Sequence, residues 1–162
     1  MEDEERFWRE YVERRIPTAY PGIGRVISAF RAAGGLVVVD SHSYSHYIER
    51  DYRANGLPMP DVVFGWDIPP EQRKPSPYTL LELQRRYRLL PSEILVVDDL
   101  KPGYDMARAA GCDFAAAGWA YAIPSIEAFM RRNCDFYFAT VDELYAFLQK
   151  NGPVAPIGGA AE

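Results

Sequence analysis

Short apolar runs rich in β-branched residues alternate along this chain with segments of helical periodicity. Runs that favour strands lie at 36–40, 62–66, 94–98, 114–119 and 135–139, and helical patterns lie near 22–33, 43–55, 76–88, 103–110, 124–132 and 141–150. Strands that are almost continuously apolar must be covered on both faces. The alternation therefore predicts an α/β fold, with a mostly parallel sheet, helices on both faces and right-handed crossovers.

The overall composition narrows the class of protein. A chain of 162 residues is long enough for one domain with a sizeable core. Its 18 basic and 23 acidic residues give a net charge of −5, which argues against nucleic-acid or anionic-membrane partners. The apolar runs are far shorter than a bilayer span, and the acidic start MEDEERFWRE is not a signal peptide. Two cysteines, Cys112 and Cys134, suit a reducing cytoplasm, so we expect a cytoplasmic protein.

The two ends of the chain differ from the middle. Residues 1–20 place Phe7, Trp8 and Tyr11 at helical spacing, and prolines then interrupt the chain before residue 23. Residues 151–162 are rich in Gly, Pro and Ala, which predicts a disordered tail. The main domain is therefore expected to occupy residues 21–150.

Polar residues follow two of the predicted strands, and a third polar element lies between them. Asp40-Ser41-His42-Ser43 follows LVVV, Asp98-Asp99 follows ILVV, and Lys74 stands in the loop RKPSP, which its prolines stiffen. The carboxyl ends of parallel strands meet at one edge, so these groups are expected to share one crevice. Adjacent carboxylates repel each other, which favours a cation or lysine beside them. Ser41 and Ser43 also precede a helix, so an N-cap is their alternative role.

Taken in order, these segments resemble the haloacid dehalogenase superfamily of phosphohydrolases, especially its phosphoglycolate-phosphatase-like branch. The resemblance runs from about Pro21 to Leu148 and rests on PGIGRVISAFRAAGG, Ser41, RKPSP and VVDDLKPGYDMARAAG. It implies a Rossmann-like core and Mg²⁺-dependent hydrolysis of the phosphate monoester of a small metabolite through an aspartyl-phosphate.

The resemblance also implies individual roles. Ser41 is expected to hydrogen-bond the phosphoryl group, and Lys74 to neutralise its charge. His42 is expected to bind phosphate beside them. Asp98 and Asp99 are the expected Mg²⁺ ligands. The substrate itself cannot be read from these residues, because residues of a separate cap domain set it in this family.

One part of the family pattern is missing upstream of Pro21. The family's nucleophile lies in a first strand followed by Asp-x-Asp-x-Thr, whereas residues 1–20 resemble the end of the cap helix and its return hinge. The resemblance therefore implies that the first core strand is absent from this chain's pattern, and that strand is central in the family's sheet. The strands at 36–40 and 94–98 would then pair directly, leave a gap, or accept a strand from a homodimer or another chain. Direct pairing is the simplest of these.

Two questions stay open on the sequence alone. In an alternative assignment, VVVDSHSYS is itself the first motif, with Asp40 as nucleophile and His42 in the place of the general acid. The chain as a whole fits an incomplete hydrolase, one half of a split enzyme, or a non-catalytic descendant that binds phosphate compounds or a protein partner.

Overall fold

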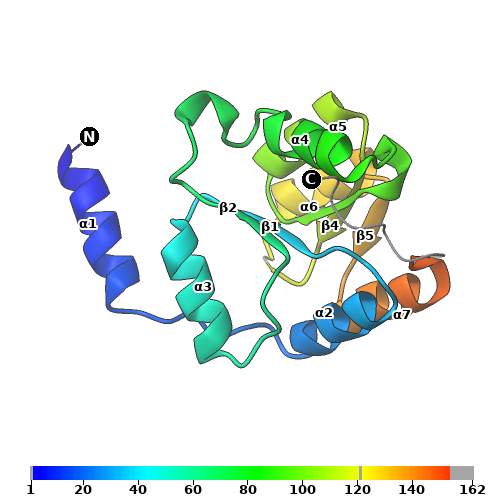
Figure 1. The fold of residues 1–162 in the computed structure, drawn as a ribbon, viewed down its shortest axis with the longest axis horizontal. Helices are drawn as coiled ribbons and strands as arrows, with labels where there is room; N and C mark the ends of the chain where they lie inside the picture. The colour runs from blue at the N-terminus through cyan, green and yellow to red at the C-terminus, as the bar shows by residue number, and fades with distance from the viewer. Residues whose placement is uncertain (1, 121, 154–162) are drawn as a thin grey trace.

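The five strands that the computed structural model describes form two parallel sheets (Figure 1). The model describes residues 2–120 and 122–153. In the first sheet β1 (Val38–Asp40) pairs with β2 (Val62–Phe64), so that Asp40 lies opposite Phe64. In the second, β3 (Leu95–Asp98) pairs with β4 (Asp113–Ala117), which pairs with β5 (Phe136–Phe138). All strand pairs are parallel, as the sequence predicts.

Helices connect the strands in the alternating order that the sequence predicts. They are α1 (Glu2–Glu13), α2 (Ile23–Ala32), α3 (Ser45–Ala54), α4 (Tyr78–Tyr87), α5 (Lys101–Ala110), α6 (Pro124–Asn133) and α7 (Val141–Asn151), with short 3₁₀ turns at Pro70–Gln72 and Pro91–Glu93. Helix α7 includes Asn151, which the prediction assigned to the tail. Residues 154–162, the rest of that predicted tail, lie outside the described residues. No helix within the described ranges combines the length and apolarity needed to cross a membrane.

Strand β4 shows why helices cover both faces of the larger sheet. Phe114 and Ala116 point into a core formed with α4, α5 and α6, whereas Ala115 between them packs with α2 and α7. This is the period of two that a strand buried on both sides requires. In Figure 1, α4, α5 and α6 lie on one side and α2 and α7 on the other. The predicted doubly covered α/β architecture is confirmed.

The two sheets share one hydrophobic core although they are not hydrogen-bonded to each other. Val38 of β1 and Phe64 of β2 pack against the same core cluster as Val96 of β3. Within the described residues, however, β1 pairs only with β2 and β3 pairs only with β4. The expectation that the strands at 36–40 and 94–98 pair directly is therefore wrong. Side-chain packing joins the sheets, and the facing strand edges stay separate.

Helix α1 is held at its carboxyl end by α3. The guanidinium of Arg50 donates hydrogen bonds to the carbonyl oxygens of Val12, Glu13 and Arg15, which a helix leaves without partners. Two aromatic side chains of α1 are exposed, Phe7 by 71% and Tyr11 by 44%. Residues 2–20 therefore attach to the domain through α3, while α1 itself extends away from the sheets (Figure 1).

Candidate active site

An ion pair joins the loop before α4 to the end of β3. Lys74 Nζ lies 2.8 Å from Asp98 Oδ2, and the side chains of Lys74 and Asp98 are only 11% and 14% exposed. These two residues are 24 positions apart, and the fold brings them together because β3 ends beneath the loop that carries Lys74. The expected convergence of Lys74 with the acidic pair at a strand end is therefore present.

Asp98 is fixed at both carboxylate oxygens. Oδ1 accepts hydrogen bonds from the backbone N–H groups of Asp99 (2.7 Å) and Leu100 (3.1 Å), while Oδ2 accepts from Lys74. Burial by itself would raise the pKa of Asp98, but the charge and hydrogen bond of Lys74 together with the turn hydrogen bonds hold it below the ordinary value. Gly103 in α5 leaves room for this arrangement, because a Cβ there would collide with the Asp98 carboxylate.

Asp40 reaches the same region from the end of β1. Its Oδ2 accepts a 2.5 Å hydrogen bond from the Thr79 hydroxyl, and Thr79 is buried in α4. Burial raises the pKa of Asp40 above its ordinary value; Thr79, Lys74 and His42 act in the opposite direction, and the charge of Asp98 adds to the rise. Asp40 is therefore a half-buried carboxylate that shares the electrostatic environment of Lys74 and Asp98.

Ser41 and His42 occupy the turn that follows β1. The Ser41 hydroxyl accepts a 3.1 Å hydrogen bond from the Ser43 N–H, and His42 Nε2 lies 3.4 Å from the Lys74 carbonyl oxygen. The N-cap of α3 is Tyr44, which has no side-chain capping bond, so the N-cap role considered for Ser41 and Ser43 is wrong. His42 thus connects the two loops that carry the predicted phosphate-binding residues.

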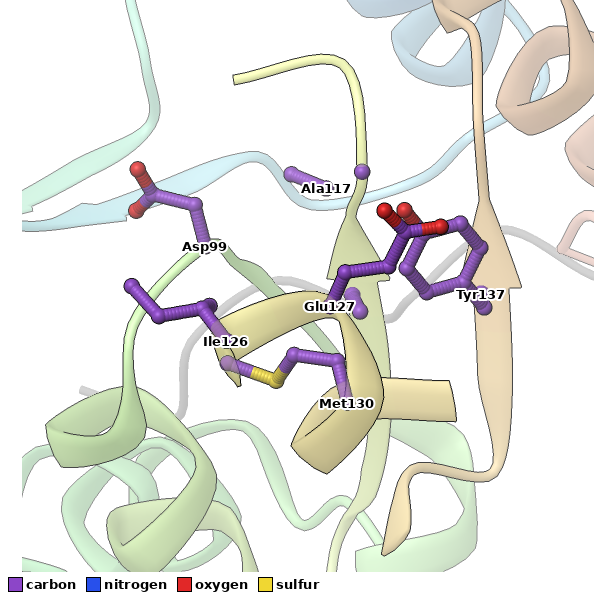
Figure 2. A pocket seen from close by; sticks show the side chains of 8 residues that line it. Asp99, Ala117, Ile126, Glu127, Met130 and Tyr137 are labelled. Carbon is purple, nitrogen blue, oxygen red and sulfur yellow. The ribbon is translucent and has the colours of Figure 1, made fainter. Parts of the chain in front are cut away.

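Asp99 lines a small hollow at the carboxyl ends of β3, β4 and β5. The hollow has a volume of about 10 Å³, about that of one water molecule, with Asp99 at one end and Glu127 and Tyr137 at the other (Figure 2). Burial raises the pKa of Asp99 to about 6, and its hydrogen bond and charge repulsion with Asp98 add to the rise. The charge of Lys74 acts in the opposite direction but does not offset this rise, and a cation near the two carboxylates would lower their mutual repulsion.

A larger hollow lies beside the start of α5. It has a volume of about 290 Å³ and is lined mainly by apolar side chains of α5 and α6, including Leu100, Ile126 and Phe129.

Among the described residues, no group of three or more His, Cys, Asp or Glu side chains is arranged to hold a metal ion. The candidate metal ligands are therefore the two carboxylates at the end of β3, not a closed protein cage.

Two residues of the site were not found from the sequence. Thr79 fixes Asp40, and its signal was a hydroxyl residue within the buried stripe of α4 that Leu80 and Leu83 also form. Gly103 makes space for Asp98, and its signal was a glycine inside a helix, where glycine is otherwise unfavourable. Both act on residues that the sequence did identify.

The sequence matches a family model of known hydrolases. Residues 2–111 match the model of the haloacid dehalogenase-like hydrolases. The chain is 31% identical over 112 residues to the phosphoglycolate phosphatase of Nitrosospira multiformis, covering 68% of this chain and 48% of that protein. It is 30% identical over 155 residues to the phosphoglycolate phosphatase of Chromobacterium violaceum, covering 91% and 67%. The chain thus spans about half to two thirds of the length of these relatives.

Solved structures share the fold. A haloacid dehalogenase-like protein from Agrobacterium tumefaciens superimposes with a TM-score of 0.73 and 20% identity, covering 93% of this chain and 68% of that one. A HAD family hydrolase from Deinococcus radiodurans, solved with bound phosphate and sodium, gives 0.67 and 23%, covering 83% and 61%. With the family model matched over most of the sequence, the chain belongs to the haloacid dehalogenase-like hydrolase family.

Proposed function

We propose that this chain carries the phosphate- and metal-binding part of a Mg²⁺-dependent phosphomonoester hydrolase of the phosphoglycolate-phosphatase type. The observation that carries the proposal is the half-buried Lys74–Asp98 ion pair at the end of β3, with Asp40 beside it. The named activity of the relatives supports the same reaction class and a small phosphorylated metabolite as substrate.

The proposed roles follow from the charges at the crevice. Lys74 would offset the negative charge on the phosphoryl oxygens, in a position screened from solvent where such an attraction is strong. The Ser41 hydroxyl would orient one of those oxygens. His42, which contacts the Lys74 loop, would bind phosphate beside them.

Asp98 and Asp99 would hold the Mg²⁺. Oxygen ligands suit this ion, which commonly keeps several waters and takes only one or two carboxylates from the protein. The raised pKa of Asp99 supports the assignment, because a nearby divalent cation relieves the repulsion between the two carboxylates. When bound, the ion would add positive charge on the phosphoryl oxygens.

The position of the nucleophile distinguishes two versions of the proposal. In the family the nucleophilic aspartate precedes the cap, in a segment that the matched residues of this chain do not include. Asp40 is the alternative, since it is half-buried, accepts a hydrogen bond from Thr79 and interacts electrostatically with Lys74. We favour the first version, because the spacing from Ser41 to Lys74 suits the second and third motifs of the family, and no later strand ending in Ser or Thr precedes Lys74.

We further propose that another strand completes the fold in the cell. The edges of β1 and β3 that do not face β2 and β4 lack strand partners within residues 2–120 and 122–153. A strand from a second copy of the chain, or from a partner chain, would satisfy them.

The free thiols of Cys112 and Cys134 favour the reducing cytoplasm as the location.

Binding of 2-phosphoglycolate in the presence of Mg²⁺, measured by calorimetry, tests the phosphate site. Lys74→Ala is expected to weaken binding by tenfold or more, since charge-assisted hydrogen bonds contribute about 1.5–3 kcal/mol. Lys101→Ala is the matched control: Lys101 also pairs with an aspartate, but its side chain is 63% exposed. Equal binding by wild type and Lys74→Ala would contradict the proposed site.

Turnover of p-nitrophenyl phosphate by the same proteins tests the nucleophile. The chain alone is expected to be no faster than the Lys74→Ala, Asp99→Asn double variant, because covalent catalysis needs a carboxylate placed to attack phosphorus. A clear excess over the double variant that Asp40→Asn abolishes would identify Asp40 as the nucleophile instead.

A further inference from the structure

Three side chains gather beside the Lys74 loop, at the carboxyl ends of β1 and β2. The Arg73 guanidinium stacks on Trp66, with its Cζ 3.9 Å from the ring centre. The His42 ring meets Trp66 edge-on, with 5.6 Å between ring centres, and also contacts the Lys74 carbonyl oxygen. The backbone N–H of Trp66 donates a 2.8 Å hydrogen bond to the Ser43 carbonyl oxygen, which holds the segment after β2 against the turn after β1. The cluster is therefore continuous with the proposed phosphate site.

Arg73 keeps donors that the described part of the chain does not use. Its Nε donates a 3.0 Å hydrogen bond to the Ile68 carbonyl oxygen, which orients the guanidinium. No carboxylate of residues 2–120 and 122–153 forms an ion pair with it, whereas seven other arginines each pair with one. Stacking occupies the face of the guanidinium and leaves the in-plane N–H groups of both terminal nitrogens available.

This arrangement suits a planar anion. A guanidinium presents paired N–H groups that match the two oxygens of a carboxylate, and the indole behind it excludes water from one face. The hydrogen bond from Arg73 Nε to the Ile68 carbonyl oxygen orients the guanidinium before a ligand binds. Less conformational entropy is therefore lost on binding. A lysine at this position would offer charge without the matching geometry.

We propose that Arg73, supported by Trp66, binds a carboxylate on the organic part of the phosphate ester, so that the site selects phosphorylated hydroxy acids. The inference rests on the proposed phosphatase function, because Lys74 must hold the phosphate while Arg73 holds the acid. It adds a residue that sets specificity within the core itself, next to Lys74 in the sequence and in the same loop.

Matched pairs of ligands test this assignment by calorimetry in the presence of Mg²⁺. We compare 2-phosphoglycolate with 2-hydroxyethyl phosphate, and 3-phosphoglycerate with glycerol 3-phosphate; each pair differs by a carboxylate against an alcohol. Wild type is expected to bind at least one acid about tenfold more tightly than its alcohol. Arg73→Gln is expected to remove that preference while leaving affinity for the alcohols unchanged, and Trp66→Leu is expected to weaken the preference.

Arg86→Gln is the control variant, because Arg86 also stacks on an aromatic ring, Tyr87, but on the exposed end of α4. It is expected to keep the preference for the acid. Equal affinity of wild type for acid and alcohol in both pairs, or an unchanged preference in Arg73→Gln, would overturn the assignment of Arg73 and leave the phosphate site standing. No binding of any of the four ligands to wild type would overturn both.

Discussion

Asp40 is a half-buried carboxylate that the fold keeps at a cost in stability. Its pKa is raised by burial, although Thr79 donates a hydrogen bond and Lys74 attracts its charge. An acid whose pKa is higher in the folded than in the unfolded state is neutral in both states at low pH. As the pH rises through the unfolded value of 3.8, the unfolded chain ionises more readily and the folded state loses relative stability.

Asp40→Asn is therefore expected to raise the melting temperature at pH 7 by a few degrees, since about 1 kcal/mol corresponds to roughly 2–4 °C for a domain of this size. The asparagine oxygen can still accept the Thr79 hydrogen bond, so the change removes mainly the charge. Thermal melts followed by circular dichroism at pH 7 and at pH 3.5 measure the effect, which should shrink at the lower pH.

Asp105→Asn serves as the control, because Asp105 pairs with Lys101 at the surface, where an ion pair contributes little. It is expected to leave the melting temperature almost unchanged. A lower melting temperature for Asp40→Asn at pH 7 would mean that Lys74 and Thr79 more than offset the burial of the charge.

Helix α5 connects the packing of an element to the geometry of the site. It begins directly after the acidic pair, and Gly103 in its first turns faces the Asp98 carboxylate so closely that no Cβ fits between them. Asp98 cannot turn away, because both of its oxygens are hydrogen-bonded. The helix and the end of β3 therefore fix each other's position.

Gly103→Ala is expected to destabilise the protein by about 1–3 kcal/mol, although alanine normally favours a helix interior over glycine. Urea unfolding measures the difference. Gly24→Ala is the matched variant within α2: a Cβ there would meet only the end of the flexible Leu57 side chain, at 3.2 Å, so a neutral or stabilising effect is expected. Stabilisation by Gly103→Ala would show that α5 can shift away from Asp98.

At the scale of the whole molecule, the separation of the two sheets is the main structural feature. One edge of β1 and one edge of β3 carry backbone N–H and C=O groups. None of the strands that the structure describes forms β-sheet hydrogen bonds with these groups. An unpaired buried backbone group costs about 1–3 kcal/mol, a large share of a domain's stability of about 5–15 kcal/mol. Such edges favour pairing with another chain.

We expect the chain to associate or to be only marginally stable by itself. Either light scattering should detect a dimer, or the melting temperature should be low. The melting temperature should then rise with protein concentration and with Mg²⁺, because any species that binds the folded state stabilises it by mass action. The contrary result is a strict monomer whose cooperative melt at high temperature does not respond to Mg²⁺. That result would show that the two sheets are stable without a further strand.

Much of the local structure could be predicted before the fold was known. Every predicted strand and helix is present, because the period of apolar residues depends on near neighbours in the chain. The strand-end positions of Asp40 and Asp98 followed from the same pattern, since each ends an apolar run. The placement of Lys74 beside Asp98 could be anticipated because adjacent carboxylates favour a lysine nearby and because the RKPSP loop resembles a motif of the family.

Other features were decided only by the tertiary structure. The sequence determined by itself that the strands are parallel, doubly covered and followed by acidic residues, because apolar patterning and turn residues are local signals. It did not determine that β1 and β3 stay in separate sheets, since the partner of a strand edge depends on every other element available to it. Nor did it reveal the hydrogen bond from Thr79 to Asp40 or the stacking of Arg73 on Trp66, because these contacts join loops and helices whose relative positions only core packing sets.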